Sequence, residues 1–340
     1  MKKIIDVAIV GVSGYTGLEL VKILIQHPNF NVNYVATSSG DEKISQLHQS
    51  LKDIFEIDVQ KVDIEEIAKK SQLVFLALPH KTAMEFVKDL MKFKDLKIVD
   101  LSADYRLEKD LYEKHYVPHT DSENLKNAVY GLPELFKSEI SNSRLIANPG
   151  CYPTASILGV LPFLKYKKVG TSITIDAKSG VSGAGKKCSN STHFVSINDN
   201  MFAYNPMKHR HSPEIEEKLG QFGDEVKYKV NFIPHLVPVT RGMLASIYIE
   251  LENEIDPISV LKRFYKNSPF IRIRENPVTM KNSAGTNFCD IFAKSDEKFL
   301  YIETSIDNLL RGASSQAVVN ANLMFGFEET IGIPMISTTP

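Results

Sequence analysis

The strongest constraint on the fold is a short N-terminal stretch in which a buried strand meets a glycine turn. Residues 4–10, IIDVAIV, are almost all aliphatic, and GVSGYTG follows at once at 11–17. The next residues repeat apolar side chains at the spacing of one helix face: Leu18, Leu20, Val21, Leu24 and Ile25. A strand buried on both faces that turns through glycines into an amphipathic helix is typical of a doubly wound parallel sheet.

The rest of the first half continues this alternation of strands and helices. Further short apolar runs predict strands at 32–37, 73–78, 97–102 and 144–148, with helical stretches such as 81–92 between them. Short links between strand, helix and strand imply parallel strands joined by right-handed crossovers. At 340 residues, the chain is long enough for a second domain beyond this one.

The glycine turn predicts a dinucleotide site. Its spacing is G-x-x-G-x-x-G, and its place between a strand and a helix makes the signal stronger than the glycines alone. Glycines let the backbone approach a pyrophosphate, and the helix N-terminus supplies N–H donors. We expect Gly11, Ser13, Gly14, Tyr15, Thr16 and Gly17 to bind the cofactor. The alternative is a tight turn that binds nothing.

The end of the second predicted strand favours NADP over NAD. An NAD site usually has Asp or Glu there, which binds the ribose 2′-hydroxyl. Here the sequence is VATSSGDEK, so Ser38 and Ser39 occupy the place of the acid, and Lys43 adds a positive charge nearby. Hydroxyls donate to a 2′-phosphate that a carboxylate would repel. An ordinary serine-rich loop is the other interpretation.

The second half changes to the period of β-strands. Alternating or short apolar runs predict strands at 226–232, 244–251, 270–275, 288–294 and 299–305. Strands with one apolar face against the core and one polar face toward solvent indicate a mixed, largely antiparallel sheet. The segment 312–329 predicts a helix that Ser314 or Ser315 opens. The fold class is therefore α/β with an α+β part.

Cys151 stands where a strand ends and a helix begins. Asn148 ends the strand, Pro149 and Gly150 form the turn, and Pro153 suits a first helical turn. Free N–H groups and the helix dipole at this place favour a thiolate and can hold an oxyanion. We therefore predict that Cys151 is a nucleophile, the alternative being a small buried hydrophobic residue. Cys188 and Cys289 lack this setting.

A thiolate nucleophile needs an acid–base partner, and the best region is KHRHSPEI at 208–215. His209 and His211 crowd the turn before a predicted helix, with Arg210 between them. We expect His209 to be the acid–base, because His211 abuts the helix start and is better placed for a substrate carboxylate with Arg210. Glu214 more simply orients a histidine than completes a metal site, so we expect no metal. A solvated basic loop is the alternative.

Further polar loops suggest where an anionic substrate binds. DAKSGVSGAGKK at 176–187 places Ser179, Ser182 and Gly183 after a strand, where backbone N–H groups hold phosphate or cover a cofactor. DLSADYR at 100–106 contributes Ser102 and Arg106, and VPVTRGM at 237–243 contributes Arg241. Arginines bind phosphate and carboxylate in fork geometry, so together they suggest a doubly anionic substrate.

Composition excludes some partners. The formal net charge is −1 with 24% charged residues, so nothing indicates a nucleic-acid or membrane partner. No apolar run is long enough to span a bilayer, and Met1-Lys2-Lys3 does not open a signal-peptide pattern. Three widely spaced cysteines argue against a disulfide framework and suit a cytoplasmic protein. No CxxC pair is present, so a structural zinc site is not expected.

Eight segments, in this order, resemble the N-acetyl-γ-glutamyl-phosphate reductase family of arginine biosynthesis. They are VGVSGYTG, LPH, DLSADYR, NPGCYPTA, DAKSGVSGAG, KHRHSPEI, HLVPVTRGM and NLLRGASSQAVVNANLMFG, and they are spread along nearly the whole chain. The wider superfamily includes aspartate-semialdehyde dehydrogenase, which shares the cysteine chemistry and an SGAG loop. GCYPT and HRHSPEI point to the first family.

The resemblance implies a Rossmann domain that binds NADPH or NADP, at 1–148 with 313–340, and an inserted catalytic and dimerisation domain at 149–312. It implies reduction of N-acetyl-L-glutamyl 5-phosphate to the 5-semialdehyde through a Cys151 thioester, with release of phosphate. Asn308 would help to hold the cofactor, together with Ser182 and Gly183. The expected substrate-binding residues are Ser102, Arg106, Asn148, Ser179, Arg210, Glu214 and Arg241. We also expect a homo-oligomer, either a dimer or a tetramer.

Two alternatives stay open at this point. One is a related reductase for aminoadipyl phosphate or aspartyl phosphate, since selectivity lies in the shape of the pocket. The other is a non-enzymatic NADP-binding sensor, in which Cys151 would be inert toward thiol reagents at neutral pH.

Overall fold

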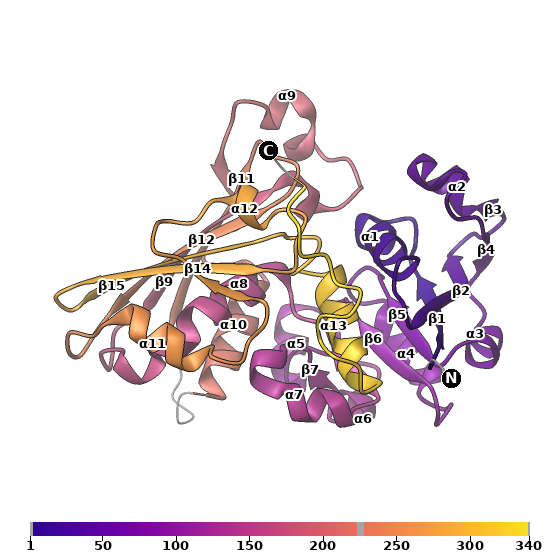
Figure 1. Cartoon of the computed structure of the whole chain (residues 1–340), viewed down its shortest axis with the longest axis horizontal. Helices are drawn as coiled ribbons and strands as arrows, with labels where there is room; N and C mark the ends of the chain where they lie inside the picture. The colour runs from indigo at the N-terminus through magenta and orange to yellow at the C-terminus, as the bar shows by residue number, and fades with distance from the viewer. Residues whose placement is uncertain (1–2, 223–227, 339–340) are drawn as a thin grey trace. The chain divides into compact units, whose positions relative to one another are not determined.

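The computed structural model of the chain describes residues 3–222 and 228–338 (Figure 1). The described residues form two compact units. Unit 1 lies within residues 1–149 and 313–334, and unit 2 within residues 150–312 and 335–340. The domain boundaries expected from the sequence differ from these units mainly after Pro334. There Ser337 Oγ donates to the carbonyl oxygens of Lys281 and Ala284, both in unit 2.

Unit 1 is built on an eight-stranded sheet in the order β3-β4-β2-β1-β5-β6-β8-β7. Every pair of neighbours is parallel except β3 with β4. The strands are β1 (Ile5–Val10), β2 (Phe30–Thr37), β3 (Glu42–Lys43), β4 (Asp58–Lys61), β5 (Leu73–Leu76), β6 (Lys97–Asp100), β7 (Val129–Tyr130) and β8 (Leu145–Ala147). The predicted parallel sheet is confirmed. Three further strands were not predicted: β3 and β7 have only two residues each, and β4, DVQK, is mostly polar and exposed, so it contains no apolar run.

Helices cover the sheet of unit 1. They are α1 (Tyr15–Leu24), α2 (Ile44–Leu47), α3 (Ile64–Lys70), α4 (Ala83–Leu90), α5 (Lys109–His115), α6 (Ser122–Leu125), α7 (Pro133–Asn142) and α13 (Ser314–Met324), with a 3₁₀ turn η1 (Gln49–Leu51). The strands β1 and β5 are almost wholly buried, which explains their continuous apolar sequence.

The late helix α13 returns to unit 1 and packs against α1, α7 and β6. All its residues are buried, including polar ones that bond inside the unit. Ser314 Oγ donates to Thr16 O, and Asn320 Nδ2 donates to Gly131 O and Asn148 Oδ1. These bonds pair several buried polar groups of α13 with other parts of unit 1, so the helix completes the interior of the unit instead of covering its surface.

Unit 2 contains a seven-stranded mixed sheet in the order β10-β11-β9-β12-β15-β14-β13. The pairs β11 with β9 and β13 with β14 are parallel, and the other four pairs are antiparallel. The strands are β9 (Ile173–Gly180), β10 (Phe202–Ala203), β11 (Val230–Val237), β12 (Met243–Glu250), β13 (Ile271–Ile273), β14 (Cys289–Asp296) and β15 (Phe299–Ile306). The predicted largely antiparallel sheet is confirmed.

One predicted strand is misplaced. The strand expected at 226–232 lies partly outside the described residues, and in the described part β11 begins at Val230 and runs on to Val237. Its second half contains Pro234, and prolines are rare inside sheets, which is why the sequence did not indicate a strand there.

The helices of unit 2 are α8 (Cys151–Val160), α9 (Phe194–Ile197), α10 (His211–Gly220), α11 (Pro257–Phe264) and α12 (Met280–Ser283), with the 3₁₀ turns η2 (Leu161–Tyr166), η3 (Val181–Ala184) and η4 (Asn190–Thr192). The central helix α8 is buried from Tyr152 to Val160 and packs against β12, β15 and α10. A β-carbon at Gly159 would lie 2.7 Å from Ile247 Cδ1. The glycine thus allows α8 to approach the sheet closely.

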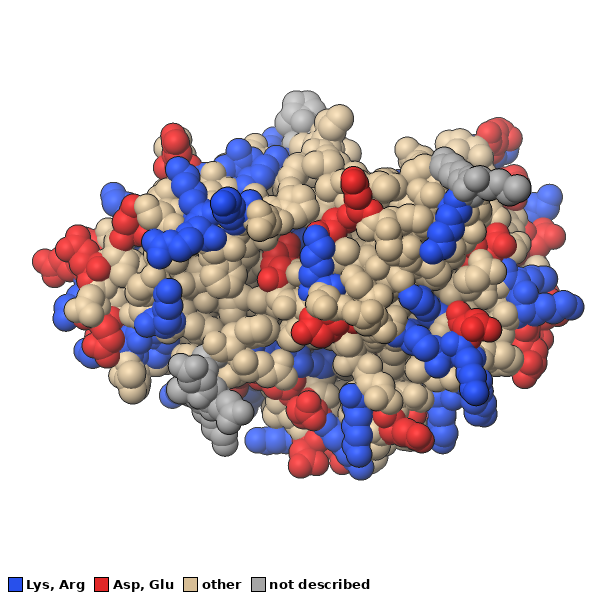
Figure 2. Space-filling view, turned by 60° about the horizontal axis from the view of Figure 1, so that its bottom comes forward, with Lys and Arg blue, Asp and Glu red and all other residues tan. Residues whose placement is uncertain are grey.

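On the face drawn in Figure 2, lysines and arginines are interspersed with aspartates and glutamates. This mixture agrees with the formal net charge of −1. Among the helices that the structure describes, none is both long and apolar enough to cross a membrane.

Candidate active and cofactor sites

The glycine loop in unit 1 has a bare backbone surface. Gly11 has φ +93°, and a β-carbon there would lie 2.3 Å from Ala77 O. A β-carbon at Gly17 would lie 2.4 Å from Gly11 O, whereas one at Gly14 would meet only Gly11 O at 3.9 Å. Gly11 and Gly17 therefore permit the tight turn, and Gly14 leaves room above the loop.

Helix α1 begins directly after this loop. Its N-cap is Gly14, which has no side chain to bond the first N–H groups of the helix. Such a helix start favours a bound anion through its N–H donors and dipole. The loop therefore has the features that a pyrophosphate site needs.

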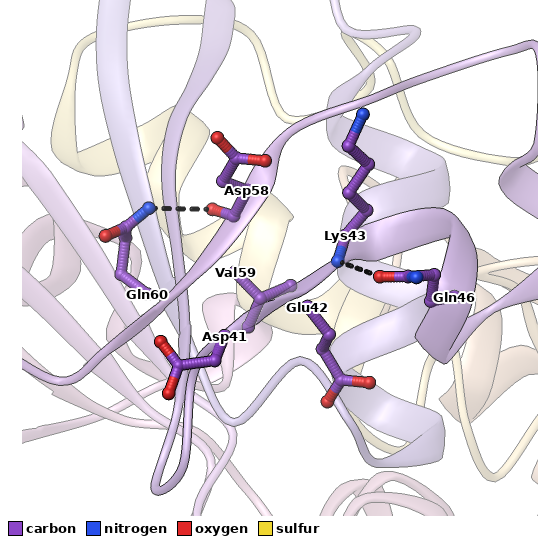
Figure 3. A pocket seen from close by; sticks show the side chains of 7 residues that line it. All are labelled: Asp41, Glu42, Lys43, Gln46, Asp58, Val59 and Gln60. Atoms are coloured by element: carbon purple, nitrogen blue, oxygen red, sulfur yellow. Dashed lines mark hydrogen bonds between the residues drawn. The ribbon is translucent and has the colours of Figure 1, made fainter.

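The segment after β2 presents hydroxyl groups and no acid. Ser38 and Ser39 are exposed, while Thr37 is buried and its Oγ1 accepts from Gly40 N at 3.0 Å. The acids Asp41 and Glu42 come later and line a pocket at the edge of the sheet with Lys43, Gln46, Asp58, Val59 and Gln60 (Figure 3). In that view Asp41 and Glu42 point to one side and Lys43 to the other.

The expected substrate residues of unit 1 are buried and bonded within the unit. Ser102 Oγ donates to Asp100 Oδ2 at 2.7 Å, and Arg106 Nε donates to Asn148 O at 2.7 Å. Asn148 Nδ2 donates to Ala313 O. Ser102, Arg106 and Asn148 are each at most 4% exposed. These bonds give the three residues a role in holding the loop after β6, and their contact with substrate stays a prediction.

Two buried carboxylates, Asp100 and Asp104, flank Ser102 in the sequence. Burial, and then the charge of Asp104, raises the pKa of Asp100 to about 7. Asp104 accepts from Lys81 N and from the Tyr112 hydroxyl. The sequence motif DLSADYR thus encodes a buried polar network at the carboxyl end of β6.

In unit 2, Cys151 is the first residue of α8. The N-cap is Gly150, whose backbone N–H donates to Glu214 Oε1 at 3.0 Å. Glu214 lies in the first turn of α10 and is 1% exposed. Cys151 is half-buried, so its sulfur combines a helix N-terminus with partial access to solvent. In the described part of the chain none of the three cysteines forms a disulfide.

Aromatic side chains surround the start of α8. The Tyr204 hydroxyl donates to the Tyr152 hydroxyl at 2.9 Å, and the latter donates to His235 O. Burial raises the pKa of both phenols, and the charge of Cys151 contributes to both shifts. Both tyrosines are therefore neutral hydroxyl groups within electrostatic reach of the sulfur.

The two candidate histidines lie beside these tyrosines. The ring centroid of Tyr152 is 5.6 Å from that of His209 and 5.8 Å from that of His211, and the two imidazoles are 4.8 Å apart. The structure thus brings His209 and His211 together next to the residue that follows Cys151. Arg210, between them, is exposed and is the N-cap of α10.

His209 is uncharged at neutral pH. Burial, and then the charge of Arg210, lowers its pKa to about 4. Its Nδ1 accepts from His211 N at 3.1 Å, so the hydrogen of the neutral ring is on Nε2. The ring can therefore donate a hydrogen bond from Nε2.

The polar loops of unit 2 are joined through Asn308. Asn308 Nδ2 donates to Ser182 Oγ at 2.9 Å, and Asn308 Oδ1 accepts from Gly242 N at 2.8 Å. Ser179 is 1% exposed, and a β-carbon at Gly183 would lie 2.8 Å from its Oγ. The contacts of Ser182, Gly183 and Asn308 with a cofactor stay predictions.

Two residues near the site have contacts that no local pattern predicted. Asp307 is fully buried; Arg241 Nε lies 3.3 Å from its Oδ2, which also accepts from Gly285 N. Gly312 packs against Cys151. Asp307 belongs to no motif, and the segment that begins at Asn308 does not say what Gly312 contacts, so only the folded chain shows both contacts. No group of three or more His, Cys, Asp or Glu among the described residues is arranged to hold a metal ion.

Family models match both halves of the chain. The model described as semialdehyde dehydrogenase, NAD binding domain, matches residues 6–143, and the one described as semialdehyde dehydrogenase, dimerisation domain, matches residues 151–308. Proteins named N-acetyl-gamma-glutamyl-phosphate reductase match over almost the full length. That of Sulfurimonas denitrificans is 60% identical, with 99% of each chain covered. That of Methanocaldococcus jannaschii is 40% identical and covers 98% of this chain and 99% of its own.

Solved structures with the same fold are more distant in sequence. Aspartate semialdehyde dehydrogenase II of Vibrio cholerae has a TM-score of 0.74 at 16% identity, covering 95% of this chain and 99% of its own. Aspartate semialdehyde dehydrogenase of Candida albicans, solved with NADP, has a TM-score of 0.71 at 16% identity, covering 97% and 100%. These likenesses establish the fold.

The glycine loop between β1 and α1, the cysteine at a helix start and the matched family models together define an NAD(P)-dependent oxidoreductase of the semialdehyde dehydrogenase class. Within that class, the chain belongs to the N-acetyl-gamma-glutamyl-phosphate reductase family. The family resemblance, the fold and the enzyme class expected from the sequence are thereby confirmed.

Proposed function

We propose that the chain reduces N-acetyl-L-glutamyl 5-phosphate to N-acetyl-L-glutamate 5-semialdehyde with NADPH, releasing phosphate, as a step of arginine biosynthesis. The observation that carries the proposal is the placement of Cys151 as the first residue of α8, after an N-cap glycine whose N–H is held by a buried glutamate. Unit 1 is the cofactor domain in this proposal, and unit 2 is the catalytic domain.

The residues of unit 1 fit a bound NADPH. The bare surface at Gly14 and the uncapped start of α1 suit the pyrophosphate, and the exposed Ser38 and Ser39 suit the 2′-phosphate. When bound, NADPH supplies the hydride that reduces the acyl group.

The chain's own chemistry centres on Cys151. Its thiolate attacks the acyl carbon of the substrate, the bond from that carbon to the phosphate oxygen breaks, and phosphate leaves with the bonding electrons. A thioester on Sγ remains. The N–H groups in the first turn of α8 are the donors that would stabilise the oxygen that becomes negative during the attack. After reduction the C–S bond breaks, which frees the aldehyde and restores the thiolate.

The histidine pair handles the proton of the thiol in this proposal. One ring takes that proton before the attack, which forms the thiolate, and can return it to Sγ after the aldehyde has left. The low pKa of His209 and the hydrogen bond to its Nδ1 leave it a neutral donor, which suits stabilisation of an oxyanion. These two facts weigh against our expectation that His209 is the acid–base, and they favour His211 in that role.

Arginines in unit 2 supply the positive charge that a doubly anionic substrate needs. Arg210 is exposed next to the histidines, and the ion pair with Asp307 fixes the guanidinium of Arg241. We assign the substrate carboxylate and phosphate to these two groups.

The experiment that tests the proposal separates the substrate from its relatives. NADP reduction is measured with N-acetyl-glutamate semialdehyde, aspartate semialdehyde and aminoadipate semialdehyde, each with and without phosphate. We expect phosphate-dependent turnover with the first. Turnover with one of the others would show a related reductase, and none with any would show a binding protein.

A second readout identifies the nucleophile. Acyl phosphate mixed with the enzyme without NADPH should leave an adduct on the peptide that contains Cys151, detected by mass spectrometry. Cys151→Ser should bind NADPH and lose activity by at least about a thousandfold, because a serine hydroxyl is hardly ionised at pH 7. Cys188→Ser, at an exposed cysteine, is the matched control and should keep full activity.

We also infer a homo-oligomer, a dimer or a tetramer, that works in the cytoplasm. The match to a dimerisation domain supports self-association, and the absence of disulfides among the described cysteines suits a reducing compartment. Light scattering of the purified chain tests the oligomeric state.

A further inference from the structure

His48 makes a contact with the glycine loop that its sequence position did not suggest. It follows α2 and is 8% exposed. Its Nε2 lies 2.6 Å from Val12 O, and because a carbonyl oxygen only accepts, the imidazole donates this bond. Val12 is fully buried and is the second residue of the glycine loop.

The backbone N–H groups of Gly11 and Val12 are bonded to β2. Gly11 N and Val12 N both donate to Ala36 O, at 2.8 Å and 3.3 Å. The backbone of Val12 is therefore fixed through both its N–H and its carbonyl group. His48 supplies the second of these two anchors.

His48 lies in the segment 38–57, which follows β2 and begins with Ser38 and Ser39. This segment contains β3, which is the edge strand of the sheet, and α2 (Figure 1). Backbone hydrogen bonds connect residues within the segment: Ile44 N donates to Ile57 O, and Leu51 N donates to His48 O. Ile44 is fully buried, so the segment packs against the rest of unit 1.

We propose that His48 is a positioning residue for the cofactor: its bond to Val12 O holds the 2′-phosphate segment at Ser38 and Ser39 in register with the pyrophosphate loop. This inference rests on the proposed use of NADPH. A ligand that contacts both the segment at Ser38 and Ser39 and the glycine loop gains affinity when both are fixed in position before it binds.

The test is direct binding of NADPH and NADH to the full chain, followed by the fluorescence of the nicotinamide ring. His48→Leu removes the donor and keeps an apolar side chain in the buried place. We expect the Kd of NADPH to rise roughly tenfold, the effect of one lost hydrogen bond. The rise for NADH should be smaller, because NADH lacks the 2′-phosphate. In turnover, KM for NADPH rises while kcat stays within about twofold of the unchanged enzyme.

Two further variants separate positioning from packing. His48→Gln restores an N–H donor and should recover most of the affinity. His48→Asn is polar but too short to reach Val12 O, and it should behave as His48→Leu does; it also replaces that variant if the leucine protein does not fold.

His27 is the matched control. It is also a buried histidine of unit 1, 6% exposed, whose Nε2 bonds a carbonyl oxygen, Ile331 O at 2.9 Å, away from the loop. His27→Leu should lower the melting temperature and leave the Kd of NADPH unchanged.

The outcomes are distinct. A Kd for the His48→Leu protein within twofold of the original, or an equal rise in the His27→Leu protein, overturns the inference. If the unmodified chain binds NADH more tightly than NADPH, the proposed cofactor is wrong. The role of His48 in holding the loop is then decided by the Kd of NADH in the same variants.

Discussion

Gly312 packs against Cys151, the proposed nucleophile: a β-carbon added at position 312 would lie 2.6 Å from Cys151 Cβ and 2.6 Å from Asn308 O. Real β-carbons do not approach other atoms so closely. Any side chain at position 312 must therefore move either Cys151 or the backbone at Asn308.

Gly312→Ala should therefore lower kcat by about a hundredfold, because a misplacement of the nucleophile by about 1 Å has an effect of that size. NADPH binding should persist. The measurement is kcat per folded molecule. Gly170→Ala is the control, because no atom lies within 4 Å of the added β-carbon although φ is +81°. That variant should lose some stability and keep kcat, and equal kcat losses in both variants would contradict the role of Gly312.

The bond between Gly150 N and the buried Glu214 gives a second prediction. Glu214→Ala leaves the N-cap N–H of α8 without this acceptor and should lower kcat by about tenfold or more, with a smaller change in KM. Glu214→Gln keeps an oxygen acceptor and should recover much of the activity. Steady-state kinetics with thermal melts of both proteins tests this, and equal activity of the alanine and glutamine variants would argue against the positioning role.

The sequence predicted the start of the catalytic helix well because several local signals agreed. Pro149, Gly150 and Pro153 each restrict the backbone, and α8 begins at Cys151, within one residue of the expected place. The same holds for the loop at 11–17, where the glycines stand between a wholly apolar strand and a periodic helix.

Other parts of the site depend on contacts between distant residues, which local patterns do not contain. Glu214 Oε1 accepts from Gly150 N, 64 residues away, a contact that no local pattern indicates, and the expectation that Glu214 orients a histidine stays a prediction. Arg106 was expected at the substrate, and the described bonds use its guanidinium on backbone carbonyls of Leu101 and Asn148. An arginine motif reports charge, and only the packing decides whether that charge faces a ligand or the protein.

Ser38→Asp should shift cofactor choice. A carboxylate beside the 2′-phosphate repels it, so the Kd of NADPH should rise by about tenfold or more, while NADH binds as well as before or better. Titration of both cofactors against the unmodified and variant chains measures this. Lys43→Ala tests whether that lysine adds attraction, and tighter binding of NADH than NADPH to the unmodified chain would refute the assignment.

Burial of His209 has a consequence for stability. The folded chain protonates this ring near pH 4, while the unfolded chain does so near the ordinary value of 6.5. Between these values the unfolded state holds more protons, so stability falls as the pH falls. The contribution of His209 is complete above about pH 6.5, and up to about 3 kcal/mol is lost by pH 4. Urea unfolding of His209→Asn should show a shallower fall over this window than the original chain, and equal slopes would contradict the burial argument.

The pH dependence of turnover decides between the two histidines. If His211 is the acid–base, His211→Asn loses the limb of the kcat profile that falls near neutral pH, while His209→Asn keeps that limb at lower kcat. The reason is that His209 titrates near pH 4 and its Nδ1 is engaged by His211 N, so it has no proton to exchange at neutral pH. Both profiles are measured at saturating substrate and cofactor, with melts to confirm folding. Loss of the neutral limb in His209→Asn alone would restore our first expectation and place the proton transfer on His209.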